Sequence, residues 1–182
     1  MEDKFQKRYR ISSPRLEGWD YGSHGLYFVT ICTHGRECLF GEVVDGEMRL
    51  NDAGQAAQAE WVRLPECFQS IELDEFVIMP NHLHGIILVG AGLAPPGGAV
   101  GALLAAPPAS APTLGDILRA FKSISAIAVN RLLGRSGRSL WQRNYYEHVI
   151  RNEDELARIR EYIANNPAQW ALDRENPNCA KV

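Results

Sequence analysis

Two consecutive β-rich runs constrain the fold of this chain more than any other feature of its 182 residues. LDEFVIM at 73–79 and HLHGIILV at 82–89 are separated only by Pro80 and Asn81, a dipeptide typical of turns. Strand-forming runs joined by so short a connection pair as an antiparallel hairpin. Because both runs are largely apolar, we expect this hairpin to lie at the centre of a sheet.

The rest of the chain alternates between strand-like and helix-like segments. Further strands are predicted at 27–33, at 38–50 as a hairpin around Asp45-Gly46, and at 145–150. Helices, marked by initiating residues and apolar residues at helical spacing, are predicted at 51–64, 113–133 and 152–167. This order predicts an α+β fold with helices packed on a mainly antiparallel sheet.

The composition suits a single compact domain over residues 1–182, with 46% hydrophobic and 23% charged residues. No stretch approaches the roughly 20 apolar residues of a membrane-spanning helix. The charged start, MEDKFQKRYR, lacks the apolar core of a signal peptide. The four cysteines form no CxxC pair, which argues against a disulfide scaffold or a zinc ribbon. We therefore expect a cytoplasmic protein with no membrane partner.

One segment interrupts this predicted domain. Residues 90–112 contain five Gly, five Pro and eight Ala among 23 positions, and no charged side chain. Such a segment buries too little surface to offset the entropy it would lose on ordering. We therefore predict a flexible Ala/Pro/Gly-rich insertion at 90–112.

The net charge of −3 conceals an asymmetry between two segments. Residues 37–75 carry a net charge of −8, whereas residues 113–151 carry +5, an excess that a phosphate backbone attracts. The alternative is a solvated basic face without a ligand. The side chains that we predict to contact DNA are Arg119, Lys122, Arg135, Arg138, Arg143 and Arg158. We expect them to contact phosphates rather than bases.

Two histidines stand two residues apart in MPNHLHG. In a strand, His82 and His84 project from one face and Leu83 from the other, so the two imidazoles can chelate one metal ion. A structural zinc site would need further ligands, whereas an open Mg²⁺ or Mn²⁺ site fits two histidines and one oxygen donor. The alternative is a pair of histidines that only packs in the core.

The last predicted helix carries a tyrosine beside its apolar stripe. Counting four residues each way from Tyr162 gives Arg158 and Asn166, so a cation, a phenol and a carboxamide follow one helix face. This arrangement resembles a site, in which Arg158 would favour the phenolate of Tyr162 if its side chain points inward. The alternative is a border tyrosine that covers the edge of the core with its hydroxyl in water.

In combination, these segments resemble the HUH single-tyrosine transposases, and especially the REP-associated tyrosine transposases. The resemblance covers most of the chain outside the insertion. Its segments are YFVTICT, LDEFVIMPNHLHGIILV, LWQRNYYEHVIRN and REYIANNPAQW. The histidine pair alone is a weak signal, but a YIxNNP motif some eighty residues later makes the pattern specific.

This resemblance implies a ferredoxin-like, RRM-like HUH endonuclease fold, with the histidines on a central strand and the tyrosine on a C-terminal helix. By motif, His82 and His84 match the metal-binding pair, Tyr162 the nucleophile, and Asn166 the polar residue that completes the Mg²⁺ or Mn²⁺ site. The implied activity is a single-stranded DNA endonuclease and strand transferase that forms a 5′-phosphotyrosine on hairpin or repeat DNA. A homodimer with exchanged helices and a monomer are both compatible with the sequence.

Several alternatives stay open from the sequence. Tyr145 and Tyr146 are rival nucleophiles, and His148 is a rival ligand or base, although one of the two tyrosines is expected in the core because they alternate in a strand. Trp141 is interpreted as a core residue. The same fold could also serve a nucleic-acid-binding regulator that does not cleave, or a metal-dependent hydrolase that uses water.

Overall fold

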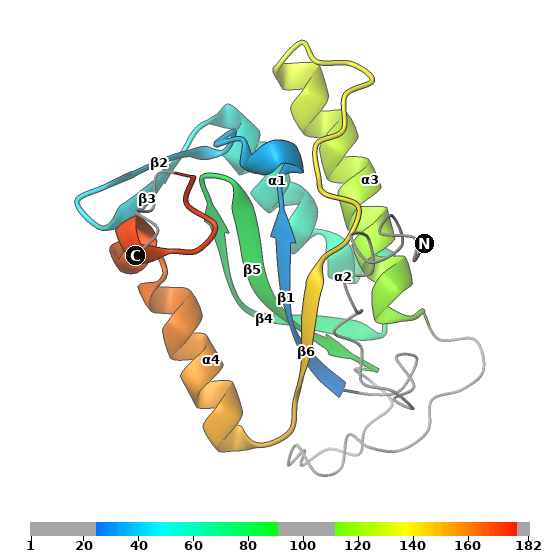
Figure 1. Ribbon diagram of the computed structural model, residues 1–182. Helices are drawn as coiled ribbons and strands as arrows, with labels where there is room; N and C mark the ends of the chain where they lie inside the picture. The colour runs from blue at the N-terminus through cyan, green and yellow to red at the C-terminus, as the bar shows by residue number, and fades with distance from the viewer. Residues whose placement is uncertain (1–24, 91–111, 178–182) are drawn as a thin grey trace, which may run out of the picture.

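The computed structural model describes residues 25–90 and 112–177 (Figure 1). Its main sheet has four antiparallel strands in the order β4-β5-β1-β6. These strands are β1 (Gly25–Cys32), β4 (Ile71–Met79), β5 (His82–Val89) and β6 (Tyr146–Ile150). The expected α+β fold is confirmed. The predicted insertion lies outside the described residues, except for its first and last positions.

Within residues 25–90 and 112–177, a separate two-stranded sheet and four helices accompany the main sheet. The small sheet is β2 (Gly41–Val44) and β3 (Glu47–Leu50), which meet at the predicted Asp45-Gly46 turn. The helices are α1 (Asp52–Val62), α2 (Leu64–Cys67), α3 (Leu114–Leu132) and α4 (Glu153–Asn165). Two short 3₁₀ helices are η2 (His34–Arg36) and η4 (Pro167–Leu172).

Each of the three long helices begins at a residue whose side chain accepts a hydrogen bond from the backbone of the first turn. The side chain of Asn51 accepts from the backbone of Gly54 at the start of α1, and Asn152 does the same for Glu155 in α4. Thr113 and Asp116 form a reciprocal capping box at the start of α3. These hydrogen bonds satisfy backbone N–H groups that have no partner within the helix, and they fix where each helix begins. The predicted helix starts are confirmed.

The predicted central hairpin is present, but only one of its strands is internal. β5 pairs with both β4 and β1, whereas β4 forms an edge of the sheet and its register shifts between Leu73 and Phe76. Two acidic residues, Asp74 and Glu75, occupy this irregularity. Charged side chains and an irregular register suit an edge strand, because an internal strand would have to bury the charges.

The two faces of the main sheet are covered by different helices. α1 and α3 cover one face, and their core includes Trp61, Phe121 and, from β5, Leu83. α4 covers the other face with a smaller cluster that includes Leu156 and Ile163. Figure 1 shows α3 and α4 at opposite sides of the sheet. Trp141 is buried in the larger core, as predicted.

A glycine after the histidine pair lets α1 approach β5 closely. A Cβ atom on Gly85 would lie 2.5 Å from Trp61, which itself is completely buried. The indole therefore occupies the space that any other residue would need, and this contact holds the strand that bears both histidines against α1.

None of the helices in the described ranges has the length and apolar character needed to span a bilayer.

Candidate metal and tyrosine site

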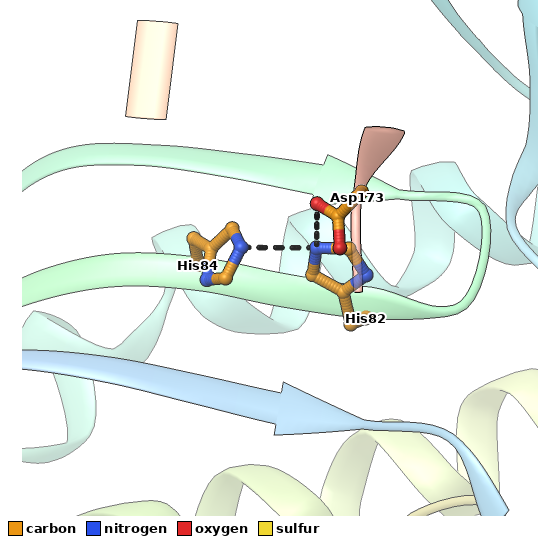
Figure 2. A group of neighbouring side chains, drawn as sticks. All are labelled: His82, His84 and Asp173. Atoms are coloured by element: carbon orange, nitrogen blue, oxygen red, sulfur yellow. Dashed lines mark hydrogen bonds and ion pairs between the residues drawn. The ribbon is translucent and has the colours of Figure 1, made fainter. Parts of the chain in front are cut away.

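The histidine pair lies on the α4 face of the sheet. His82 and His84 are both buried, and their Nε2 atoms lie 3.0 Å apart (Figure 2). Leu83, between them, points into the opposite core, as the strand periodicity predicts. Two imidazole nitrogens therefore converge on one point at the inner face of α4.

Each imidazole is oriented through its other nitrogen. Nδ1 of His82 lies 2.9 Å from Oδ1 of Asn81, and Nδ1 of His84 lies 2.8 Å from the hydroxyl of Thr30, its cross-strand neighbour. The amide nitrogen of Asn81 donates to the carbonyls of Arg36 and Glu175, which leaves its oxygen facing His82. Because an amide oxygen only accepts, Nδ1 of His82 carries the proton, and the unprotonated Nε2 faces Nε2 of His84.

Burial keeps both imidazoles neutral. It lowers the pKa of His82, while the carboxylates of Asp173 and Glu175 act in the opposite direction. Burial also lowers the pKa of His84 well below its usual value, and the neighbouring His82 lowers it further. A neutral imidazole is the form that binds a metal ion, so the two side chains are suited to act as ligands at neutral pH.

The tyrosine of α4 reaches this pair. The hydroxyl of Tyr162 lies 3.3 Å from Nε2 of His84, and its ring packs edge-on against His84 and Phe28. Burial raises the pKa of the Tyr162 hydroxyl, and the carboxylates of Asp173 and Glu175 raise it further. Without added positive charge, the phenol is therefore held in its protonated form.

An acidic residue that sequence reasoning missed completes the cluster. Asp173 follows η4, and its Oδ2 lies 3.9 Å from Nε2 of His82 (Figure 2). One ligand atom from each of His82, His84 and Asp173 falls within 4.8 Å of the others. No local pattern marks this aspartate in LDREN, because its position depends on how the segment after α4 folds back over the sheet.

Asn166 gives a direct indication that the cluster suits a cation. This residue is buried at the end of α4, and its amide nitrogen donates to Oδ2 of Asp173. Its carbonyl oxygen is buried and has no hydrogen-bond partner in the described part of the chain. Two neutral imidazoles, a carboxylate and an unpaired amide oxygen are a donor set that fits a divalent ion such as Mn²⁺ or Mg²⁺.

A pocket of about 530 Å³ opens in front of this cluster. Its lining includes His84, Tyr162, Asn166, Asp173, Thr30 and Tyr146. His84, Thr30 and Tyr146 occupy one row across β5, β1 and β6, so the pocket floor is formed by three neighbouring strands. The predicted catalytic and metal-binding side chains thus lie in or directly beneath one solvent-accessible depression.

The structure separates the two rival tyrosines. Tyr146 is half-exposed and lines the same pocket as Tyr162, whereas Tyr145 packs against the core on the opposite face. His148 pairs with Glu155 at 2.7 Å and is not part of the histidine cluster. Of the two rivals, Tyr146 alone has access to the pocket.

The predicted DNA-contacting residues do not gather around this pocket. Arg119 pairs with Asp116, and Arg135 pairs with Glu37. The ammonium group of Lys122 donates to two backbone carbonyls of the segment before β6, which gives this side chain a structural role. These three residues belong to α3 and the loop after it, and α3 covers the opposite face of the sheet from the tyrosine.

The remaining predicted contacts are more accessible. Arg138 and Arg143 are exposed, and neither forms an ion pair within residues 25–90 or 112–177. Arg158 is exposed on α4 and lines a neighbouring pocket instead of the one around Tyr162. The hypothesis that Arg158 favours the phenolate therefore has no support in the geometry, because carboxylates dominate the charge acting on Tyr162.

A sequence match over most of both chains shows the family to which this chain belongs. No protein-family model matches the chain. A Haemophilus influenzae protein recorded as uncharacterized is 40% identical over 170 residues, which cover 89% of this chain and 91% of that protein. The chain belongs to the family of this Haemophilus protein.

A solved structure identifies the fold. A REP-associated tyrosine transposase bound to a REP hairpin aligns with a TM-score of 0.57 and 18% identity, over 87% of this chain and 74% of that one. The resemblance to REP-associated tyrosine transposases is thus confirmed in the fold. A candidate transposase of Deinococcus radiodurans aligns at a TM-score of 0.46 with 17% identity, over 83% of this chain and 95% of that one.

Proposed function

We propose that this protein is a metal-dependent single-stranded DNA endonuclease and strand transferase in which Tyr162 is the nucleophile. The observation that carries the proposal is the position of the Tyr162 hydroxyl, 3.3 Å from Nε2 of His84, in a pocket that also contains Asn166 and Asp173. The transposase fold supports the same chemistry. A phenol beside a set of metal ligands and open to solvent is suited to attack a phosphodiester.

The proposed ligands are His82, His84, Asp173 and Asn166. A divalent cation held by them, Mn²⁺ or Mg²⁺, would supply positive charge to the scissile phosphate and offset the negative charge that acts on the phenol. Thr30 and Asn81 hold the imidazoles in position through their Nδ1 atoms.

In the covalent step, the phenolic oxygen of Tyr162 bonds to phosphorus while the bond from phosphorus to the 3′ oxygen breaks. The phenol proton passes to solvent through the open pocket, and the departing 3′ oxygen gains a proton. The products are a 5′-phosphotyrosine and a free 3′-OH. Because one phosphodiester replaces another, a second 3′-OH can reverse the step and join two strands, which hydrolysis by water would not allow.

The proposed substrate is a DNA hairpin with a single-stranded flank. The related solved structure is described as bound to a REP hairpin, which supports this substrate class. An open pocket at the sheet surface suits a strand whose bases are not paired. Arg138 and Arg143, exposed and without ion-pair partners in the described ranges, remain our predicted phosphate contacts.

One chain supplies every proposed ligand and the nucleophile. The proposal therefore requires no second subunit, although a homodimer that exchanges α4 would build an equivalent site. Light scattering on the purified protein, alone and with DNA, distinguishes these two arrangements.

The decisive experiment is a covalent-adduct assay. Purified protein is mixed with a labelled single-stranded REP-like hairpin, in Mn²⁺ or Mg²⁺, and run on a denaturing gel. We expect an adduct with the wild-type protein and with Tyr146→Phe, and none with Tyr162→Phe, which should still bind the hairpin. Tyr146→Phe is a matched control, since both tyrosines line the same pocket.

The other outcomes identify the alternatives. An adduct that persists in Tyr162→Phe and disappears in Tyr146→Phe would transfer the nucleophile to Tyr146. Cleavage without an adduct would indicate a hydrolase that uses water, and binding without cleavage would indicate a regulator.

A further inference from the structure

We infer that a second pocket, between β6 and α4, binds the base of a nucleotide adjacent to the scissile phosphate; this inference rests on the proposed function. The pocket has a volume of about 390 Å³ and is lined by Phe28, Tyr146, His148, Glu155, Arg158 and Ile159. Phe28 and Tyr146 also line the pocket that contains Tyr162. A strand with its phosphate at Tyr162 can therefore place a neighbouring base here.

The shared wall is aromatic and accessible. Tyr146 is 48% exposed, although its neighbour Glu147 in β6 is buried. The ring of Phe28 lies edge-on to both tyrosines, with centroids 6.2 Å from Tyr146 and 6.0 Å from Tyr162. Phe28 thus connects the two pockets, and the exposed ring of Tyr146 offers a face on which an unpaired base can stack.

The opposite side of the pocket contains an anchored imidazole. Nε2 of His148 lies 2.7 Å from Oε1 of Glu155, and Oε2 of Glu155 accepts from the backbone of Arg151. Both carboxylate oxygens are therefore engaged, and the ring of His148 is held in one orientation. Its Nδ1 has no hydrogen-bond partner in the parts of the chain that the structure describes, so this atom can bond to the edge of a base.

A cation stands at the rim of the same pocket. The guanidinium of Arg158 makes one hydrogen bond, from Nε to the carbonyl of Asp154, and no carboxylate lies within ion-pair distance of it in residues 25–90 and 112–177. Arg158 precedes Tyr162 by about one helical turn on α4. Its charge is therefore available to a phosphate next to the one that Tyr162 attacks.

The combination points to a nucleotide in a single strand. A stacking face, a hydrogen-bonding edge and a cation correspond to the base and phosphate of one nucleotide. A paired base would first have to unstack and unpair to enter the pocket, so a base from a single-stranded flank is the favoured occupant.

A thermodynamic cycle on Tyr146 tests this inference. The base is removed from the single-stranded flank of the hairpin at one position at a time. Dissociation constants are measured by fluorescence anisotropy. All proteins carry Tyr162→Phe, so that the DNA stays intact. Tyr146→Ala should weaken binding of the complete hairpin about tenfold. At a single flank position, removal of the base should have the same effect and should not add to that of Tyr146→Ala.

Three further variants make the result specific. Tyr146→Phe should bind like the parent, because it keeps the stacking ring. Ile127→Ala, an exposed residue of α3 on the opposite face of the sheet, should have no effect. Arg158→Ala should weaken the binding of all oligonucleotides similarly, abasic ones included. The slope of the logarithm of the binding constant against the logarithm of the salt concentration should fall by about one.

Additive effects of Tyr146→Ala and base removal at every position would overturn the inference, as would full affinity in Tyr146→Ala. Because this measurement requires only DNA binding, the pocket inference can fail while the adduct assay supports the proposed function. The pocket inference can also hold while the adduct assay shows no cleavage. Mapping the cut made by wild-type protein then shows whether the coupled position is next to the scissile phosphate. A coupled position remote from the cut would contradict the assignment.

Discussion

The two faces of the main sheet are built from the same strands but differ in what they bury. Under α1 and α3, the strands contribute a continuous apolar core that closes around Trp61 and Phe121. Under α4, a small apolar cluster lies beside buried imidazoles and a buried carboxamide. The comparison indicates that the first face supplies stability, whereas the second gives up part of its apolar packing to hold polar groups near solvent.

The strand β5 shows this division in consecutive residues. His82 belongs to the site and Leu83 to the larger core, and both are completely buried. Substitutions at these neighbouring positions should therefore have opposite consequences for activity and stability.

The largest effect is expected from His82→Ala. It removes one of the two proposed imidazole ligands, so we expect no cleavage at any metal concentration and loss of Mn²⁺ binding measured by electron paramagnetic resonance. The matched change Leu83→Ala should lower the free energy of unfolding by about 2–5 kcal/mol and leave Mn²⁺ binding of the folded protein unchanged. Full cleavage by His82→Ala in the presence of chelator would dismiss the metal site.

A smaller effect on the site is expected from Asp173→Asn. The change keeps the shape of the side chain and its contact with Asn166 but removes the negative charge of a proposed ligand. We expect Mn²⁺ affinity measured by titration calorimetry to fall by at least tenfold. Glu175→Gln, a change in a nearby carboxylate outside the ligand cluster, is the control and should have a much smaller effect. Equal losses in both variants would show that only the local charge matters.

On the stabilising face, Gly85→Ala probes the contact between β5 and α1. The new Cβ would lie 2.5 Å from the ring of Trp61, so one of the two elements must move. We expect the free energy of unfolding, measured in urea, to fall by about 1–3 kcal/mol. Combining the change with Trp61→Leu should recover part of this loss relative to Trp61→Leu alone. Unchanged stability of the single variant would contradict the close packing.

The smallest effect concerns the attachment of α4. Arg160 of this helix donates two hydrogen bonds to Asp74 of β4, at 2.8 and 2.5 Å, and this pairing lowers the pKa of Asp74. A carboxyl whose pKa is lowered by folding stabilises the protein above its unfolded pKa, near 4, and that contribution disappears as the pH falls further. Asp74→Asn should therefore lower the free energy of unfolding by about 0.5–1 kcal/mol at pH 7.

Urea unfolding at pH 7 and at pH 3 checks this expectation. The difference between wild type and Asp74→Asn should shrink at the lower pH. A difference that is independent of pH would mean that the two hydrogen bonds contribute through shape and not through charge.

The chain's local signals predicted most secondary structure correctly. The turn at Pro80-Asn81, the capping residues Asn51 and Asn152, and the capping box at Thr113 all act between residues close in sequence. Their hydrogen bonds form within a single turn, so they depend little on the rest of the fold. The edge position of β4 was not predicted, because the order of strands depends on pairing between distant segments.

The candidate site was predictable in part for the same reason. The spacing of His82 and His84 places them on one side of any strand, and Tyr162 and Asn166 share one face of any helix. No periodic sequence pattern marks Asp173 or the pocket around Tyr146. Lys122 is predicted to contact DNA, and its partly buried ammonium group donates to carbonyls of the segment before β6, a position that only the tertiary structure reveals.

The amino-acid sequence alone thus determined which side chains share a face of each strand and helix, since backbone geometry sets those directions within a few residues. Only the tertiary structure decided which faces meet. It brought the phenol of α4 to the imidazoles of β5 and added a carboxylate from the segment after η4. Such contacts join residues about 80 or more positions apart, and they depend on the packing of the whole sheet, which no local pattern encodes.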